Sequence, residues 1–282
     1  MTRNGLDFDT KLQYFGFYVA VVLLIVYSFT PALWLILTSL KETSQIIKVP
    51  LQYIPNPVTF EQYSQVFERA PFGAFILNSV IVSLSSMVLT VFIATLASYA
   101  LARLRVRHKQ AWLTAFLLIS TYPLIALMVP LFQTFREIGL LNTYPALILP
   151  YSVFSMPISI WILTTFFRTI PSDLEDAALI DGCSRVGTLI RVIFPLSAPG
   201  VATASMITFV NSWNEFTLAF SLMSDEHRYT LPVGVTLLRD QFVTPWGLIS
   251  AGATITIIPL VLLIVFYQKS LISGLTAGSV KG

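Results

Sequence analysis

The chain has 282 residues, of which 55% are hydrophobic and only 11% are charged, and its mean hydropathy is +0.77. Soluble domains carry about 25% charged residues and disordered chains are poorer in apolar side chains, so this composition excludes both a water-soluble and an intrinsically disordered protein. A formal net charge of +3 would suit nucleic acid, but a membrane protein needs Lys and Arg in its cytoplasmic loops anyway. We therefore expect a lipid environment and no nucleic-acid partner.

Residues that bind metals or form disulfides are scarce. The chain has one cysteine, Cys183, and two histidines, His108 and His227. A single cysteine cannot form a disulfide within the chain, and these three residues do not have the spacing of a zinc site. We expect no metal and no cofactor on this chain.

The first apolar run covers about residues 14–37. It is longer than the apolar core of a signal peptide, about 7 to 15 residues, and no A-x-A-like cleavage site follows it, so we expect a retained membrane anchor. Each of the later runs is long enough to cross about 30 Å of hydrocarbon as a helix. These runs lie at about 72–102, 112–132, 144–167, 200–223 and 247–267. The sequence predicts an all-α membrane protein, a single domain over 1–282 with six transmembrane helices.

Lys and Arg are unevenly divided between the two sides of this predicted bundle. Eleven fall on the side of the two termini and six on the opposite side. The densest local group is 103–109. By the positive-inside rule, both termini are expected to be cytoplasmic.

Two segments on the opposite side are not expected to span. In 41–70, prolines are frequent, and Thr59 with Gln62 has the spacing of a capping box ahead of aromatic residues at helical spacing. This pattern predicts a short helix that lies at the membrane surface on the side opposite the termini. The other segment, 224–246, is a polar loop that carries aromatic side chains.

Prolines and small polar residues interrupt the predicted spans. Interior prolines remove backbone hydrogen bonds and kink helices, so they either set the shape of the bundle or act as hinges of a moving pathway. These prolines are Pro123, Pro130, Pro150, Pro157 and Pro259. Small polar residues in the second span favour close helix packing. They are Asn78, Ser79, Ser83, Ser85 and Ser86.

Three polar residues in the fifth span have a spacing that places them on one helical face. Asn211, Asn214 and Glu215 fall at i, i+3 and i+4. A carboxylate at membrane depth costs about 2.5–3.5 kcal/mol on insertion scales, which favours a specific role. They either line a hydrophilic pathway or form a hydrogen-bond cluster between helices.

The cytoplasmic segment 168–199 is too charged to insert and too regular to be a linker. Ser172 and Glu175 have the spacing of a capping box, and acidic residues fill the first turn, where the helix dipole favours them. Small residues follow, and Gly182 provides the backbone freedom for a C-terminal turn. Ser184 is then expected to cap a second helix that ends at Pro195.

This predicted helix–turn–helix pair could lie on the lipid surface or dock on another protein. The small face of Ala177 and Ala178 favours docking, because a helix that faces lipid would carry large apolar residues. The chain has no G-x-x-x-x-G-K-[ST] phosphate loop and no recognised hydrolytic motif, so we expect that it does not bind ATP through such a loop.

The same segment resembles a motif of permeases from binding-protein-dependent ABC importers. That motif reads E-A-A, three residues, Gly, nine residues, Ile, one residue, Leu-Pro. The matching positions are Asp176, Ala177, Ala178, Gly182, Val192, Phe194 and Pro195. Glu175 and Asp181 are similar to the carbohydrate branch, in which E-E-A-A and D-G are typical. The chain departs from the motif at three positions, with Asp176 for Glu, Val192 for Ile and Phe194 for Leu.

The resemblance extends over nearly the whole chain, to the smaller permease subunit of maltose-type and trehalose-type importers. It rests on Asn78-Ser79, on 99–103, on 213–216 and on the tail from Gly274. It implies the type I importer fold, a prokaryotic inner-membrane location, a second homologous permease chain and two ATPase subunits that bind ATP and Mg. It also implies an extracytoplasmic solute-binding protein.

What the resemblance implies for individual residues differs between the two loops. Residues of the coupling loop, 168–199, would couple the chain to the ATPase: Glu175, Asp176, Ala177, Ala178, Asp181, Gly182 and Pro195. The outer loop, 224–246, would contact the binding protein through Arg228, Tyr229, Gln241 and Phe242. We expect a permease for a di- or oligosaccharide, with no enzymatic activity of its own.

Other functions remain open on the sequence alone. The same architecture could import a polyol or glycerol derivative. An ion-coupled secondary transporter would use Glu215 for its proton, although such transporters commonly show internal repeats that this sequence lacks. A membrane-embedded enzyme is a third class, but Glu215 has no His or Asp beside it.

Overall fold

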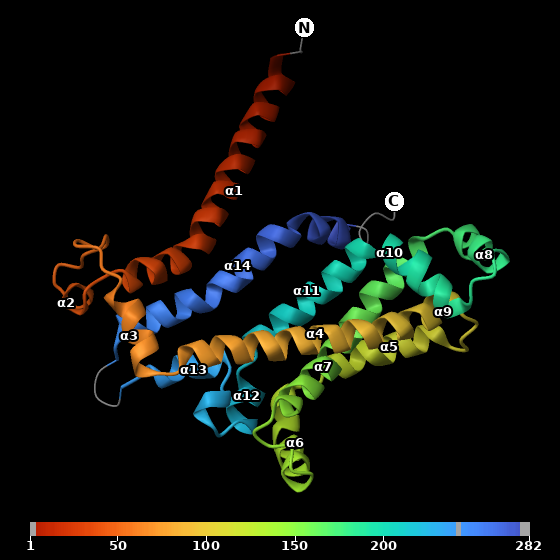
Figure 1. Cartoon of the computed structure of the whole chain (residues 1–282). Coiled ribbons are helices and arrows are strands. Elements are labelled where there is room, and N and C mark those ends of the chain that lie inside the picture. Colours follow the sequence, from red (N-terminus) through yellow and green to blue (C-terminus); the bar gives the residue numbers. More distant parts are fainter. Residues whose placement is uncertain (1–3, 241–243, 277–282) are drawn as a thin grey trace. The chain divides into compact units, whose positions relative to one another are not determined.

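The computed structural model describes residues 4–240 and 244–276, and their side chains over 13–240 and 244–268. Within these residues, all regular structure is helical (Figure 1). The contacts divide the chain into two units, which are described separately. Unit 1 consists of Met1–Ala70 and Leu238–Ile255, and unit 2 of Pro71–Leu237 and Thr256–Gly282.

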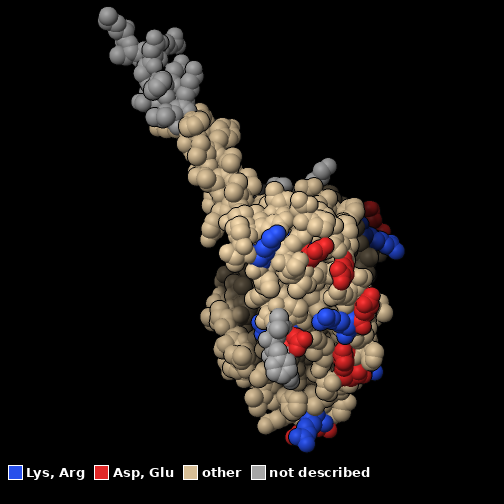
Figure 2. Space-filling view, turned by 90° about the vertical axis from the view of Figure 1, so that its left-hand side faces the viewer, with Lys and Arg blue, Asp and Glu red and all other residues tan. Residues whose placement is uncertain are grey.

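Unit 1 contains a long helix and two short ones, together with the start of the last helix. They are α1 (Asn4–Ser39), α2 (Thr43–Ile46), α3 (Glu61–Arg69) and the first turns of α14 (Trp246–Thr276). From residue 13 to its end, α1 carries no charged side chain, and its surface is uncharged in Figure 2. No residue in the most apolar 18-residue stretch of this helix is buried. The helix therefore presents a surface suited to lipid or to another apolar chain.

The helix expected after Thr59 is present as α3, but its capping box is not. The Thr59 hydroxyl accepts a hydrogen bond from the Glu61 backbone N–H at 3.1 Å. The Gln62 side chain does not return to this turn. It is buried and donates to the Lys41 carbonyl at 3.4 Å and to the Thr43 hydroxyl at 3.3 Å. The Gln62 amide provides a hydrogen-bond donor for the buried Lys41 carbonyl, and this stabilises the fold more than a solvent-exposed helix cap would.

Unit 2 contains the remaining helices. In chain order they are α4 (Phe72–Arg103), α5 (Lys109–Ser120), α6 (Leu124–Glu137), α7 (Tyr144–Thr169), α8 (Ser172–Ile180), α9 (Arg185–Thr188), a π-helix (Leu189–Ile193), α10 (Phe194–Leu196), α11 (Ala198–Asn214), α12 (Thr217–Leu222), a 3-10 turn (Glu226–Arg228), α13 (Leu231–Leu237) and the rest of α14.

The described residues include four helices that are long and apolar enough to cross a membrane. They are Gln13–Ser39, Phe72–Arg103, Tyr144–Thr169 and Trp246–Gln268. Two bent helix pairs raise the number to six if each pair is one span. These pairs are Lys109–Ser120 with Leu124–Glu137, bent by 85°, and Arg185–Leu196 with Ala198–Asn214, bent by 83°.

Two of the expected spans, 112–132 and 200–223, are not single helices. The first is interrupted between α5 and α6, where Pro123 has an extended backbone and cannot donate to the preceding turn. The second is interrupted after Asn214, because Glu215 leaves the helix with an extended backbone and caps α12 with its carboxylate. Apolar composition alone carried no signal of either break.

Of the small polar residues expected to favour packing of the second span, Ser86 lies where α4 packs against α7. Hydroxyls of α4 donate to carbonyls of α7 at a constant separation of 62 residues. The pairs are Ser86 with Ile148 at 3.5 Å, Thr90 with Ser152 at 3.3 Å and Ser98 with Ile160 at 3.0 Å. A constant offset means that the two helices run parallel and in register. Small side chains allow this close approach, as in membrane helix pairs generally.

Candidate functional site

The coupling loop folds as the predicted helix–turn–helix pair, with a different start. α8 begins at Ser172 directly after Pro171, and the Ser172 side chain does not cap it. The capping box with Glu175 is therefore wrong, because the Glu175 carboxylate is used elsewhere. The turn at Gly182 is confirmed: its φ is +85°, and the Cys183 N–H donates to the Ala178 carbonyl at 3.0 Å. This left-handed conformation favours glycine.

The second half of the loop begins as expected and ends differently. The Ser184 hydroxyl accepts a hydrogen bond from the Gly187 N–H at 3.1 Å, which confirms the predicted cap. Pro195 does not end the helix but lies in the first turn of α10. A π-helix precedes it, in which the Phe194 N–H donates to the Leu189 carbonyl five residues earlier. The wider turn fits a proline, whose ring would clash with the carbonyl of a regular α-helix.

The predicted coupling residues divide into an exposed and a buried set. Five are exposed: Asp176, Ala177, Asp181, Gly182 and Pro195. Glu175 and Ala178 are buried. Ile180, at the end of α8, is 86% exposed, so the free surface of this helix combines small, acidic and apolar groups. Such a surface suits a protein partner.

The Glu175 carboxylate faces the interior of unit 2. It accepts a hydrogen bond of 2.6 Å from the Tyr99 hydroxyl and lies 3.6 Å from the Arg103 Nε. The same guanidinium donates to the carbonyls of Phe167 and Ile170 at the end of α7. This buried cluster was not predicted from the sequence, although Tyr99 and Arg103 fall four residues apart on one face of α4.

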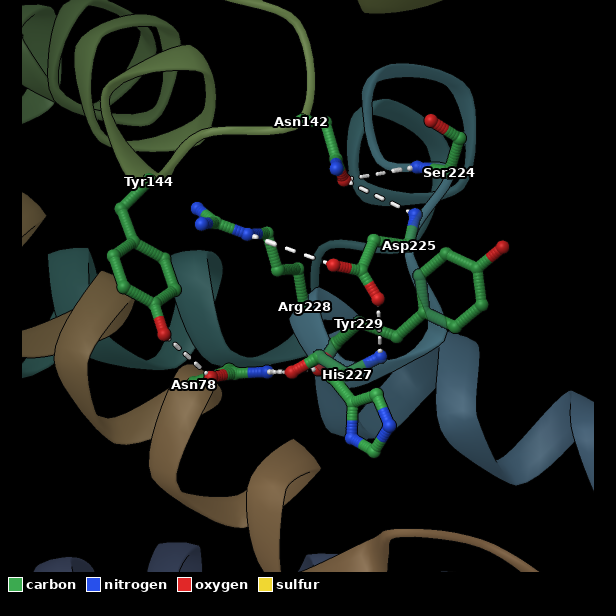
Figure 3. Close-up of polar contacts among 8 residues, drawn as sticks. All are labelled: Asn78, Asn142, Tyr144, Ser224, Asp225, His227, Arg228 and Tyr229. Carbon is green, nitrogen blue, oxygen red and sulfur yellow. Dashed lines mark hydrogen bonds and ion pairs between the residues drawn. The ribbon is translucent and has the colours of Figure 1, made fainter.

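The outer loop is held by two asparagines that come from different elements (Figure 3). Asn142, between α6 and α7, has a φ of +61°, and its side-chain oxygen accepts from the backbone N–H groups of Ser224 and Asp225 at 3.2 and 3.1 Å. The Asp225 carboxylate then caps the 3-10 turn through the His227 N–H at 3.0 Å. Asparagine tolerates the left-handed backbone better than most residues.

Asn78 is the second of these asparagines and is 97% buried, with a relative exposure of 3%. Its amide nitrogen donates to the carbonyls of His227 and Tyr229 at 2.8 and 2.9 Å, and its oxygen accepts from the Tyr144 hydroxyl at 2.8 Å (Figure 3). The neighbouring Ser79 hydroxyl accepts from the Leu231 N–H at 2.7 Å. Together these bonds fix the backbone of 227–231 on the first turns of α4.

The predicted contact residues of the outer loop are only partly described. Arg228 is exposed, lies 3.8 Å from the Asp225 carboxylate and is 5.8 Å from the centre of the Tyr144 ring. Tyr229 is half-buried and packs its ring against Phe75. Gln241 and Phe242 lie outside the described residues. Arg228 is therefore the predicted contact residue with the most accessible described side chain.

The three polar residues of the fifth span do not form one patch. Asn211 and Asn214 are exposed, and the Asn214 amide donates to the Val210 carbonyl of its own helix at 3.0 Å. Glu215 accepts hydrogen bonds from the N–H groups of Leu218 and Ala219 and from the Tyr151 hydroxyl. Because α11 ends before Glu215, the expected i, i+3, i+4 face is not completed.

Comparisons with known proteins agree with this architecture. A model of the family described as binding-protein-dependent transport system inner membrane component matches residues 91–276. The chain is 45% identical over 265 residues to a sulfoquinovosyl glycerol transport system permease protein of Agrobacterium fabrum, covering 94% of this chain and 93% of that relative. It is 40% identical over 262 residues to a trehalose transport system permease protein of Mycobacterium tuberculosis, covering 92% and 95%.

Solved structures show the same fold. A chain from the crystal structure of a bacterial ABC transporter for the acidic polysaccharide alginate matches with a TM-score of 0.79 at 20% identity, covering 91% of this chain and 96% of that one. The family match includes the whole coupling loop and the last part of α4, from residue 91. This chain belongs to the binding-protein-dependent transport system inner membrane components, and it is an all-helical permease subunit of an ABC importer, not an enzyme.

Proposed function

We propose that the chain forms half of a pathway for a di- or oligosaccharide across a prokaryotic inner membrane, with both termini in the cytoplasm. The observation that carries this proposal is the exposed surface of α8 and of the turn that follows it, formed by Asp176, Ala177 and Gly182, which would be the docking surface. Relatives that share more than 90% of this chain's length are permeases for trehalose and for sulfoquinovosyl glycerol, which supports a sugar as the cargo.

The partners follow from what the chain lacks and from its exposed surfaces. ATP and Mg would bind to two separate ATPase subunits, one of which receives α8. A second homologous permease would complete the pathway, and the uncharged surface of α1 is suited to a membrane environment beside such a partner. In this assembly ATP binding would close the ATPase pair and move the coupling loop, so that the pathway alternates between inward-open and outward-open states.

The outer loop would receive the solute-binding protein. Its first residues, 224–231, are held by Asn78, Ser79 and Asn142, while Arg228 remains exposed, which is the arrangement expected of a rigid contact surface. A solved complex of the alginate transporter includes its periplasmic protein. We assign the same role to Tyr229, Gln241 and Phe242.

The pathway would include the amides of Asn211 and Asn214, whose side chains are exposed within unit 2. Exposed amides at membrane depth favour contact with a hydroxyl-rich solute or with water. Glu215 would act mainly on structure, because both of its oxygens accept backbone hydrogen bonds.

A glycerol-containing sugar is the second candidate for the cargo. It is favoured by the relative at 45% identity, whose substrate name combines a sugar with glycerol. A panel of radiolabelled trehalose, maltose, glycerol and a glycosyl glycerol, tested for uptake in cells that contain or lack the chain, separates the two. A loss of glycerol uptake alone would contradict a sugar permease.

The docking surface is tested by copurification of the tagged chain from its native membrane, with Gly182→Asp as the variant. We expect the wild-type chain to bring down a phosphate-loop ATPase and a second membrane permease, and Gly182→Asp to lose the ATPase alone. Gly139→Asp is the matched control, because Gly139 also has a positive φ, +71°, with open space around it. A wild-type chain that purifies without an ATPase, or equal loss in both variants, contradicts the proposal.

A further inference from the structure

α4 carries a buried polar cluster near each of its ends. Near its start, Asn78 and Ser79 bind the backbone of 227–231 in the outer loop. Near its end, Tyr99 and Arg103 bind Glu175 in α8. One helix is thus attached both to the proposed binding-protein surface and to the proposed ATPase-docking helix.

The helix between these two clusters has no interruption. α4 runs for 32 residues without an interior proline, whereas α6, α7 and α14 each contain one or more. From Asn78 to Tyr99 it spans about 32 Å at 1.5 Å per residue. An unbroken α-helix transmits a displacement along its axis, while prolines and broken turns absorb it.

α4 is also held in register by its neighbour. The hydroxyls of Ser86, Thr90 and Ser98 bind three carbonyls of α7 at the same offset of 62 residues. Sliding α4 along α7 would break all three hydrogen bonds together. The two helices are therefore expected to move as one body.

The cluster at Glu175 resists separation for an electrostatic reason. The side chains of Glu175 and Arg103 are 9% and 10% exposed. Moving α8 away from α4 would leave a carboxylate and a guanidinium unpaired and poorly hydrated, which is costly for buried ion pairs. A force on α8 is therefore expected to move α4 with it.

We propose that α4 relays movement of the ATPase-docking helix α8 to the outer loop, with Glu175 and Asn78 as the positioning residues at its two ends. This inference rests on the proposed function, because it needs an ATPase on α8. It assigns Glu175 an inward role within the coupling motif, distinct from that of its exposed neighbour Asp176.

The relay is tested in the complete importer, purified with its copurifying subunits. Cys183, the single cysteine, is replaced by alanine, and the exposed Glu226 in the outer loop by cysteine. The rate at which a membrane-impermeant maleimide reacts with this cysteine is measured without nucleotide and after trapping with ATP and orthovanadate. The relay predicts a clear change in rate on trapping.

Variants at the inner cluster should remove this response without removing the ATPase. In Glu175→Gln, the trapping-dependent change is expected to fall by about tenfold, within the range of coupling changes seen for single substitutions. Tyr99→Phe should show a similar loss, and the double variant should be no worse than either single one, because both changes remove the same hydrogen bond. Asp173→Asn, an exposed change on the same helix, should respond like the background protein.

Asn78→Ala tests the outer end. It should keep the ATPase and lose the response at position 226, because the hydrogen bonds to His227 and Tyr229 are gone. A full response in Glu175→Gln, or no response in the background protein with its ATPase bound, would overturn the relay. Loss of the ATPase from Glu175→Gln would also overturn it, because Glu175 would then act in docking. Absence of an ATPase from the background protein would instead contradict the proposed function.

Discussion

The hydroxyl of Tyr151 donates a hydrogen bond of 2.6 Å to the carboxylate of Glu215, and this carboxylate closes the start of α12. The broken fifth span is therefore built around an acidic side chain that three donors satisfy: the Tyr151 hydroxyl and the N–H groups of Leu218 and Ala219. A carboxylate in this setting has a structural task that needs no proton transfer, in keeping with ATP-driven transport.

Glu215→Ala is expected to destabilise the protein by about 1 kcal/mol or more, as for loss of a helix cap, because Leu218 and Ala219 lose their hydrogen-bond acceptor. Glu215→Gln keeps one side-chain oxygen and should lose less. The apparent melting temperature of the detergent-purified complex measures both, with Asn214→Ala as an exposed neighbour for control.

Glu215→Gln also distinguishes ATP-driven from proton-coupled transport. Glu215→Gln should retain most of the uptake of the sugar that the cells import through the chain, because an amide cannot carry a coupling proton but can still accept the Leu218 N–H. If uptake in Glu215→Gln vanishes while the complex remains assembled, Glu215 has a role in the transport step itself.

Asn78→Asp changes only one side-chain group, but it should make local opening of 227–231 in the outer loop much easier. The native amide nitrogen donates to two carbonyls, those of His227 and Tyr229, and a carboxylate would place an acceptor against both. Amide hydrogen exchange within 227–231 should quicken by about tenfold, as for a local opening that becomes easier by one lost interaction.

Asn211→Asp is the control for this change, because Asn211 is exposed and the same chemical substitution there leaves no carbonyl facing a carboxylate. If 227–231 exchanges equally fast in both variants, the outer loop does not depend on Asn78. Copurification of the ATPase should be the same in both.

Much of this architecture could be predicted from the sequence, because apolar runs and the short motif in 168–199 carry strong local signals. The long helices, the turn at Gly182 and the cap at Ser184 all follow from hydropathy, backbone freedom and side-chain capping. The contacts of Glu175 could not be predicted, since its partners Tyr99 and Arg103 lie more than 70 residues away. The local sequence predicted a capping box instead, which does not form because the Glu175 carboxylate contacts Tyr99 and Arg103.

The breaks in the spans were missed for a related reason. Pro123 and Glu215 lie within runs whose average hydropathy still fits a membrane helix. Whether a proline kinks a helix or ends it depends on the neighbours that accept the freed backbone groups. Glu215 ends α11 because Tyr151 and the first turn of α12 are positioned to bind its carboxylate, which no pattern within 200–223 encodes.

Lys41 in unit 1 should make stability depend on pH. The residue is 1% exposed, and its ammonium donates to the Gln52 carbonyl at 2.6 Å and lies 4.5 Å from the centre of the Trp34 ring. Burial lowers the pKa of Lys41 below its usual value of 10.5. In the window between the lowered pKa and 10.5, the folded protein holds fewer protons than the unfolded chain, so its stability rises with pH.

Lys41→Met is the variant that reveals this dependence, because it keeps the aliphatic stem and cannot titrate. The melting temperature of the wild type relative to Lys41→Met should increase as the pH is raised toward 10.5. Lys48→Met, at an exposed lysine in the same segment, should show no such trend. A constant difference between wild type and Lys41→Met at all pH values would show that Lys41 does not titrate in this window.

The seam between α4 and α7 should tolerate the loss of a hydroxyl better than the gain of volume. Thr90→Val removes one hydrogen bond to the Ser152 carbonyl at nearly constant shape and should cost about 0.6 kcal/mol, the average for such bonds in a membrane. Ser86→Leu adds bulk where the side chain is fully buried and should cost about 1–3 kcal/mol, because the helices must separate. Val88→Leu, two residues away and 62% exposed, should change the melting temperature little. If Ser86→Leu melts like Val88→Leu, close packing of α4 on α7 does not stabilise unit 2.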